Sequence, residues 1–451
     1  MQRARFVSRA AAVGAALVLA ASTAIGAADF TLTVNAGSVG KHVYPTMFGT
    51  NVVYNKITQA QWPTFISTFN ALGMTTLRYS GGTVTEDLFD FKDSDGPNND
   101  YISLSMFLQS VAANDITPLL VVPTKRFRNN YTTTGAQYAK DYVKAVNVDH
   151  GVTGGEQFGT TQKVEIWELG NEYYGDNEGG APLSPTLYGQ IAQKFATSMK
   201  TIDASIIPVV QFVRTDLTAA QTIANQLSGG AVEACLTHTY PGDAEGIGNV
   251  ENQLINGSNI FSLEPMVTEW NMGSGSETGL VLATRIPKLF RELVDGGVTI
   301  ATQWPMMWWN NSVNSALAQA SGALRPPGQI FQWLSQCANN RKLVGTSSSS
   351  TAISSLAFKN PAGTKLFVLV LCANSLTDAQ VGITINGFNG NNFTVVQAKR
   401  YSAAGGFTTE LEEVTPATLR TVVPAKSNNV LTLTTNKYSK YEVIRIDLET
   451  P

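Results

Sequence analysis

Two stretches decide the fold: Val164-Glu165-Ile166-Trp167-Glu168-Leu169-Gly170-Asn171-Glu172 and Pro265-Met266-Val267-Thr268-Glu269-Trp270-Asn271. Each is an apolar run that ends abruptly in a polar cluster carrying a carboxylate, Glu172 in the first and Glu269 in the second. Runs of this kind are typical of strands in a parallel sheet that is covered on both faces. We therefore expect two buried parallel strands, each of which presents a glutamate at its carboxyl end.

These stretches belong to a longer alternation of short apolar strands and helix-like segments. No glycine-rich phosphate loop follows the first strand, as a doubly wound sheet would require. Eight strand-helix units predict a (β/α)8 TIM barrel over residues 41–340. The predicted strands are 45–53, 75–80, 117–123, 164–169, 206–212, 234–240, 265–270 and 298–304, with helices that include 61–72, 103–114, 135–146, 186–202, 217–227 and 279–293.

A different pattern begins at residue 341. The run from Thr346 to Thr351, rich in serine, predicts a turn or linker. Beyond it, short alternating segments are separated by Gly, Asn and Pro, which predicts a C-terminal antiparallel β-sandwich over residues 341–451. Residues 29–34 alternate in the same way, so the N-terminal segment 29–40 is expected to add a strand to this sandwich.

The first 28 residues have the three-part layout of a secretory signal peptide. Residues 1–9 are basic, an apolar stretch follows to about residue 21, and small residues occupy 24–28. The apolar stretch is short for a membrane span, and no later segment is apolar enough to cross a bilayer. We expect a protein that is secreted, to the exterior or the periplasm, after cleavage, with no membrane partner.

Composition narrows the class of partner. Charged residues make up 14% of the chain and the formal net charge is -3, so no basic field attracts nucleic acid or anionic lipid. A neutral polymer fits this balance better. The three cysteines, Cys235, Cys337 and Cys372, lack metal-ligand spacing and are expected as buried thiols, although pairing of the last two is left open. With only three histidines, we predict no metal site and no cofactor.

The two glutamates suggest a chemistry, because strand ends of a parallel barrel meet at one rim. Cleavage of a glycosidic bond uses one carboxylic acid, with a raised pKa, to protonate the leaving oxygen. A second carboxylate, kept ionised by hydrogen-bond donors or a cation, attacks the anomeric carbon. The sequence therefore predicts a hydrolase of oligo- or polysaccharides.

An Asn-Glu pair that ends the fourth strand, with a Glu that ends the seventh, resembles clan A, the 4/7 superfamily of retaining glycoside hydrolases. The resemblance covers residues 41–340. It implies that Glu172 is the acid/base and Glu269 the nucleophile of a double-displacement reaction.

Two motifs point to one family of this clan. The segment from Leu77 to Gly82 resembles the Arg-x-Pro-Gly-Gly motif of family 51, with Ser80 in place of proline, and Glu269-Trp270-Asn271 resembles its nucleophile segment. This implies an α-L-arabinofuranosidase, with families 39, 44 and 79 as alternatives.

One position departs from family 51: Val53 stands where that family usually has a sugar-binding glutamate. Thr50-Asn51 is closer to the start of some endo-acting relatives. An endo-acting β-glycanase of glucanase or xylanase type is therefore the second candidate. A non-catalytic carbohydrate-binding protein is the candidate from another class.

Several side chains are expected to support the two glutamates. Arg78 can hold the nucleophile ionised through charge-assisted hydrogen bonds. His238 and Tyr240 match a His-x-Tyr motif of the clan, with Tyr240 donating to the nucleophile. Trp304 is expected to stack on a sugar ring. The predicted substrate-binding residues are Asn51, Arg78, Asn171, His238, Tyr240 and Trp304.

Three further sets of residues lie near the predicted site. Glu168 lies deeper on the same side of its strand as Glu172 and is expected to accept hydrogen bonds behind the site. Glu86 and Asp87 either line the site or are solvated. Aromatic platforms for an extended substrate are available at Tyr173, Tyr174, Trp304, Trp308 and Trp309.

Overall fold

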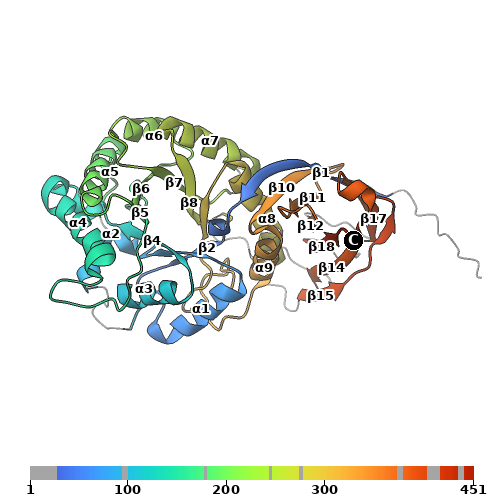
Figure 1. Cartoon of the computed structure of the whole chain (residues 1–451), viewed down its shortest axis with the longest axis horizontal. Helices are drawn as coiled ribbons and strands as arrows, with labels where there is room; N and C mark the ends of the chain where they lie inside the picture. The colour runs from blue at the N-terminus through green and yellow to red at the C-terminus, as the bar shows by residue number, and fades with distance from the viewer. Residues whose placement is uncertain are drawn as a thin grey trace, which may run out of the picture.

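The computed structural model describes residues 28–93, 100–176, 180–242, 246–273, 278–372, 379–403, 417–434 and 441–451. The predicted signal peptide lies outside these residues, except for Ala28. Within the described ranges, no helix has the length and hydropathy that a membrane span requires. The chain forms a barrel and a separate sheet, joined through helices α8 and α9 (Figure 1).

The predicted (β/α)8 barrel is confirmed. Eight strands close on themselves in the order β2 to β9, and all neighbouring strands are parallel. The strands are β2 (Gly49–Val52), β3 (Thr76–Tyr79), β4 (Thr117–Val122), β5 (Ile166–Leu169), β6 (Ile207–Gln211), β7 (Ala234–Thr239), β8 (Glu264–Trp270) and β9 (Ile300–Gln303).

Helices surround the barrel, as Figure 1 shows. They are α1 (Trp62–Ala71), α2 (Val84–Asp87), α3 (Leu104–Ala113), α4 (Ala136–Lys144), α5 (Pro185–Lys200), α6 (Leu217–Ala224), α7 (Val250–Phe261), α8 (Gly279–Asp295) and α9 (Pro326–Ala338). Short 3-10 turns are η1 (Pro45–Met47), η2 (Gln59–Gln61), η3 (Phe91–Asp93), η4 (Lys125–Phe127), η7 (Ile247–Asn249) and η8 (Asn389–Asn391), and π turns are η5 (Tyr131–Gly135) and η6 (Ala145–Asp149).

The alternation of side chains along each strand divides the barrel into an interior and an outer face. On β5, Ile166 belongs to the apolar cluster inside the barrel, while Trp167 and Leu169 belong to the cluster under the helices. Successive side chains of a strand point to opposite faces, so Glu168 faces inward above Ile166. The interior is therefore apolar at the level of Ile166 and becomes charged towards the carboxyl ends of the strands.

The second part is a single ten-stranded sheet that curls on itself (Figure 1). Its order is β15-β14-β18-β12-β11-β10-β1-β13-β17-β16, and among the described strands β1 and β13 are parallel while the other pairs are antiparallel. The strands are β1 (Phe30–Val43), β10 (Arg341–Ser348), β11 (Ile353–Lys359), β12 (Lys365–Cys372), β13 (Gln380–Asn386), β14 (Thr394–Ala403), β15 (Ala417–Thr421), β16 (Ala425–Ser427), β17 (Val430–Thr434) and β18 (Val443–Glu449).

The serine-rich run is only in part the predicted turn or linker: residues 349–351 lie in the turn between β10 and β11, but the prediction is wrong for residues 346–348. Thr346, Ser347 and Ser348 form the end of β10 and pair with residues 32–34 of β1. Thr346 is fixed further, because its Oγ1 donates to the Ser355 carbonyl at 2.7 Å and accepts from Arg291 Nη1 of α8 at 3.1 Å. Tertiary pairing thus overrides the turn-like composition.

The sheet shares its core with the barrel. Leu356, Phe358, Phe367 and Leu369 belong to the same apolar cluster as the residues beneath the barrel helices. Helices α8 and α9 provide the contact, with α8 against β1 and β11 and α9 against β10, β11 and β12. The three cysteines are buried free thiols, in agreement with the sequence.

This shared core leads to a prediction for a shortened chain. A variant that ends at Asn340 loses β10 to β18 and exposes the apolar sides of α8 and α9, and β1 loses both neighbours. Exposed apolar surface of this size promotes aggregation. We expect insoluble protein, measured as the soluble fraction after expression beside the full chain. A soluble and fully active fragment would show instead that the sheet is an independent module.

Candidate active site

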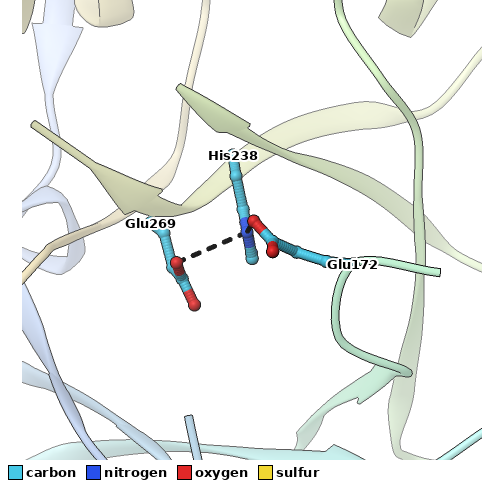
Figure 2. A group of neighbouring side chains, drawn as sticks. All are labelled: Glu172, His238 and Glu269. Carbon is cyan, nitrogen blue, oxygen red and sulfur yellow. Dashed lines mark hydrogen bonds and ion pairs between the residues drawn. The ribbon is translucent and has the colours of Figure 1, made fainter. Parts of the chain in front are cut away.

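The predicted site residues meet at the carboxyl ends of the barrel strands. Glu172 follows β5, Glu269 lies near the end of β8, and His238 lies near the end of β7. Figure 2 shows the His238 ring between the two carboxylates. His238 Nδ1 is 3.0 Å from Glu172 Oε1 and 3.5 Å from Glu269 Oε2.

Arg78 lies beneath these residues and is fully buried. Its Nε and Nη2 donate to the two oxygens of Glu168, both at 2.7 Å. Its Nη1 donates to Glu269 Oε1 at 2.7 Å and to Asn51 Oδ1 at 2.8 Å, and Nη2 also donates to Asn171 Oδ1 at 2.7 Å. A guanidinium has five N–H donors, so each of them has an acceptor here. Arg78 therefore positions side chains from β2, β5 and β8 and has no donor left for a substrate.

Gly81 makes room for this arrangement. A Cβ at this position would lie 2.8 Å from Asn51 Oδ1 and 3.0 Å from Arg78 Nη1. Any side chain at residue 81 would therefore push the amide or the guanidinium out of place. This close approach explains the first glycine, Gly81, of the motif from Leu77 to Gly82.

A β-bulge turns Glu269 towards the interior. Val267 pairs with Thr237 but Glu269 pairs with His238, so Thr268 is an extra residue in β8. Met266 faces the interior and Val267 the outer face, so strict alternation would point residue 269 outward. Bulges redirect side chains in this way and are frequent next to active sites. The inward direction of Glu269 could not be predicted from the strand pattern alone.

Two donors hold the Glu269 carboxylate from different sides. Arg78 Nη1 bonds Oε1, and the Tyr240 hydroxyl donates to Oε2 at 2.7 Å. The side chain of Glu269 is 6% exposed, whereas that of Glu172 is 21% exposed. Of the two carboxylates, Glu172 is the one with more access to solvent.

The backbone around Glu172 is unusual. Gly170 has φ +84° and Glu172 has φ +46°, a left-handed conformation that is uncommon for a residue with a side chain. A Cβ on Gly170 would lie 2.3 Å from Thr124 Oγ1. The turn places the Glu172 carboxylate where His238 contacts it and the Tyr174 hydroxyl donates to its Oε1 at 3.2 Å.

The charges of the cluster favour protonation of His238. Burial alone would lower the pKa of His238, but the carboxylates of Glu269, Glu168 and Glu172 raise it to about 9. Burial raises the pKa of Glu172, but the hydrogen bond and charge of His238, the Tyr174 hydroxyl and the charge of Arg78 together hold that pKa below its ordinary value. Burial raises the pKa of Glu269, against the opposing charges of His238 and Arg78.

The sequence predicts a raised pKa for the proton donor, Glu172, and an ionised nucleophile, Glu269. The structure gives the opposite directions, because the pKa of Glu172 is lowered and that of Glu269 is raised. The reason is His238, whose role as a cation could not be predicted from the motif. The raised pKa of His238 favours a proton on the imidazole, one hydrogen bond away from Glu172.

Glu86 is neither solvated nor lining the site, although Asp87 beside it is exposed. Its carboxylate is fully buried and accepts from the backbone N–H groups of Thr124, Lys125 and Asn171 at 2.7–2.8 Å. Its role could not be found from sequence, because its partners are backbone groups of two other loops.

Trp304 is half-buried and directly follows β9. Its ring end would be 3.0 Å from a Cβ on Gly82, which in turn would lie 3.5 Å from Val53. Asn271 Nδ2 fixes the Trp304 carbonyl at 2.6 Å. Val53 and Trp304 thus make an apolar wall on either side of Gly82.

The other aromatic candidates divide into buried and exposed groups. Tyr173 is buried and stacks on Tyr188, with ring centroids 4.2 Å apart, so it is part of the core. Trp308 is half-buried and packs edge-on against Trp304. Tyr174 is 38% exposed and Trp309 is 45% exposed, so these two rings are accessible to a ligand.

Glu172, His238 and Glu269 present one oxygen or nitrogen each within 4.8 Å of one another, a spacing that a metal ion could use. Two contacts argue for a different use. Both oxygens of Glu269 already accept from Arg78 and Tyr240. A cation placed here would also be repelled by the buried Arg78 guanidinium. The donor set suits a polar organic substrate better than a metal ion.

Comparisons with known proteins give structural relatives but no sequence relatives. No protein-family model matches the sequence, and no curated protein matches it. An α-L-arabinofuranosidase from Thermotoga maritima, in complex with arabinose, matches 93% of this chain over 100% of its own, with 15% identity and a TM-score of 0.72.

Two further matches belong to numbered glycoside hydrolase families. The family 51 arabinofuranosidase from Xanthomonas axonopodis pv. citri is 11% identical with a TM-score of 0.74, over 94% of this chain and 100% of its own. A family 44 xyloglucanase from Paenibacillus polymyxa, with xyloglucan, is 11% identical with a TM-score of 0.63, over the same shares. The chain shares the complete two-part fold of these enzymes.

The protonated His238 leads to a prediction for stability. Its folded pKa of about 9 lies above the ordinary value of 6.5, so protonation stabilises the fold fully below about pH 6.5. This stabilisation is lost as the pH rises through 9. We expect the free energy of unfolding in urea to fall between pH 7 and pH 9.5 in the wild type, with a flatter profile for His238→Asn.

His150→Asn is the matched control for this experiment. His150 has φ +54°, a conformation that asparagine also adopts, and it lies outside the cluster. The control should follow the wild-type profile. Parallel profiles for the wild type and His238→Asn would contradict the predicted charge state.

Proposed function

We propose that this protein is a retaining glycoside hydrolase, with Glu172 as acid/base and Glu269 as nucleophile. The observation that carries the proposal is the pairing of a half-buried and a buried carboxylate at one rim. Their facing oxygens lie within 4.8 Å, and each carboxylate has its own donors. Retaining enzymes have carboxyl groups about 5–5.5 Å apart, whereas inverting enzymes need about 6.5–9.5 Å to admit a water.

In the first step, Glu269 attacks the anomeric carbon and Glu172 protonates the departing oxygen. The roles follow from exposure and contacts. Glu269 is the less exposed carboxylate and is oriented by Arg78 and Tyr240, as a nucleophile requires. Glu172 is the more exposed and lies 3.0 Å from His238 Nδ1, which carries the proton at rest and passes it to Glu172 when substrate displaces water.

In the second step, Glu172 acts as a base and removes a proton from the water that cleaves the glycosyl-enzyme. Esterification removes the negative charge of Glu269. Because two nearby carboxylates raise each other's pKa, the loss of that charge favours the ionised form of Glu172. The same residue can therefore serve as acid first and as base afterwards.

For the substrate, we propose an α-L-arabinofuranoside at the end of a neutral polysaccharide. The support is the Arg78 to Gly82 motif, the Glu269 to Asn271 motif and the higher TM-scores of the arabinofuranosidases than of the xyloglucanase. Export after cleavage of the predicted signal peptide belongs to this proposal and rests on the sequence alone.

Specific observations favour an endo-acting β-glycanase as the second candidate. The wall made by Val53 and Trp304 is apolar where an exo-acting enzyme would need polar groups to hold a terminal sugar. The exposed rings of Tyr174 and Trp309 can stack on further sugar units of a polymer.

The roles of the glutamates can be separated by the leaving group of the substrate. Glu269→Ala should abolish hydrolysis of all substrates, because the covalent intermediate cannot form. Glu172→Ala should lower kcat/KM for a natural polysaccharide by about 100- to 10,000-fold, the usual contribution of a general acid. It should lower kcat/KM far less for an aryl glycoside whose phenolate departs unprotonated.

The paired variants control for each other, since each removes one carboxylate from the same cluster. Equal losses on both substrate types in Glu172→Ala would contradict the assigned roles. Binding of oligosaccharide by the wild type without any hydrolysis would show a carbohydrate-binding protein instead.

The products distinguish the two substrate proposals. Exo action on arabinofuranosides should release only arabinose from arabinan or arabinoxylan at early times, with little change in viscosity. Trp309→Ala should then leave the rate unchanged, because a single terminal sugar does not reach this exposed ring. A ladder of oligosaccharides from a β-linked polymer, slowed by Trp309→Ala, would favour the β-glycanase.

A further inference from the structure

We propose that Glu86 is a positioning residue for the acid/base: it fixes the loop that carries Glu172 without touching the substrate. This inference rests on the proposed role of Glu172. The Glu86 side chain comes from α2, directly after the Gly81-Gly82 pair, and lies with Thr124, Lys125 and Asn171 in the interior, each with at most 1% exposure.

The contacts of Glu86 join two loops of the rim. Its Oε2 accepts from the backbone N–H groups of Thr124 and Lys125, both at 2.7 Å. Its Oε1 accepts from the backbone N–H of Asn171 at 2.8 Å and from Thr124 Oγ1 at 3.1 Å. One carboxylate thus holds the loop after β4 against the loop after β5. Hydrogen bonds of backbone N–H groups to a buried carboxylate are short and strong.

Lys125 extends the same support past Glu172. Its Nζ donates to the carbonyl of Gly175 at 2.8 Å, and the Gly175 N–H donates to the Glu172 carbonyl at 2.9 Å. Glu172 is therefore held on its N-terminal side through Asn171 and on its C-terminal side through Gly175. Both supports begin at Glu86, since it also fixes the backbone of Lys125.

The position of Glu172 depends on this support, because its own backbone is in a left-handed conformation at φ +46°. Such conformations persist only where the surroundings impose them. Relaxation of Asn171 would move the Glu172 carboxylate relative to the leaving oxygen, whereas Glu269, held from β8 by Arg78 and Tyr240, would stay in place.

The test uses Glu86→Gln, which keeps the size of the side chain but places an NH2 donor against backbone N–H donors. Misplacement of a catalytic group by about 1 Å costs about 100-fold in rate, so kcat on a polysaccharide should fall by about that factor with KM little changed. The kcat/KM for an aryl glycoside with a good leaving group reports only the first step, so it should stay close to that of the wild type. In a Glu172→Ala background, Glu86→Gln should cause no further loss.

Asp87→Asn is the matched control, since it removes the same charge one residue away at an exposed position and should leave both rates unchanged. If Glu86→Gln does not fold, Lys125→Met removes the bond to Gly175 together with a positive charge near Glu86 and Glu172, and should show the same leaving-group dependence, more weakly. Melting temperatures confirm that all variants are folded during the assays.

Three results are distinguishable. Leaving-group dependence in both Glu172→Ala and Glu86→Gln, without additivity, supports the inference. Dependence in Glu172→Ala but equal losses on both substrates, or no loss, in Glu86→Gln overturns the inference and leaves the proposed function standing. Absence of dependence in Glu172→Ala overturns the proposed function, and the role of Glu86 falls with it.

Discussion

The buried guanidinium of Arg78 is the interaction on which the site depends. Three carboxylates, Glu168, Glu172 and Glu269, lie at one end of the barrel interior with little solvent to separate them. Moving an ion out of water costs several kcal/mol, and removing one partner of a buried pair typically costs about 3–5 kcal/mol. Arg78 and protonated His238 offset this charge, and the five donors of Arg78 fix acceptors from three strands. The site is therefore complete only when β2, β3, β5 and β8 are all in place.

Local backbone features then set the direction of each carboxylate. Gly81 allows Asn51 and Arg78 to approach, the extra residue Thr268 turns Glu269 inward, and the left-handed turn after β5 presents Glu172. Each feature departs from regular strand geometry, and each lies within a few residues of a functional side chain. The apolar interior lower in the barrel is regular, which provides a rigid base for these departures.

Much of this arrangement could be predicted from the sequence, because it follows from short patterns. Apolar runs that end in polar clusters indicated the eight strands, and their common rim indicated that Glu172 and Glu269 would meet. The remainder depends on contacts between distant segments. The bulge in β8 is visible only against β7, and the role of Glu86 only against the backbone of two loops. The serine-rich end of β10 was misread because a strand can take such residues when a neighbour such as β1 pairs with them.

The place of β1 has a consequence for how the chain reaches its native state. This strand lies between β10 and β13, whose partner residues are separated from it by 298 to 351 positions in the sequence. In the sequence β1 precedes the barrel strands, and Leu32 and Val34 can pair only once β10 and β13, which follow the barrel, are available. Contacts this distant in sequence slow folding, because a long loop must close before they form. We therefore expect completion of the sheet to be a late step of folding, and an unpaired β1 to offer other chains an open strand edge until then.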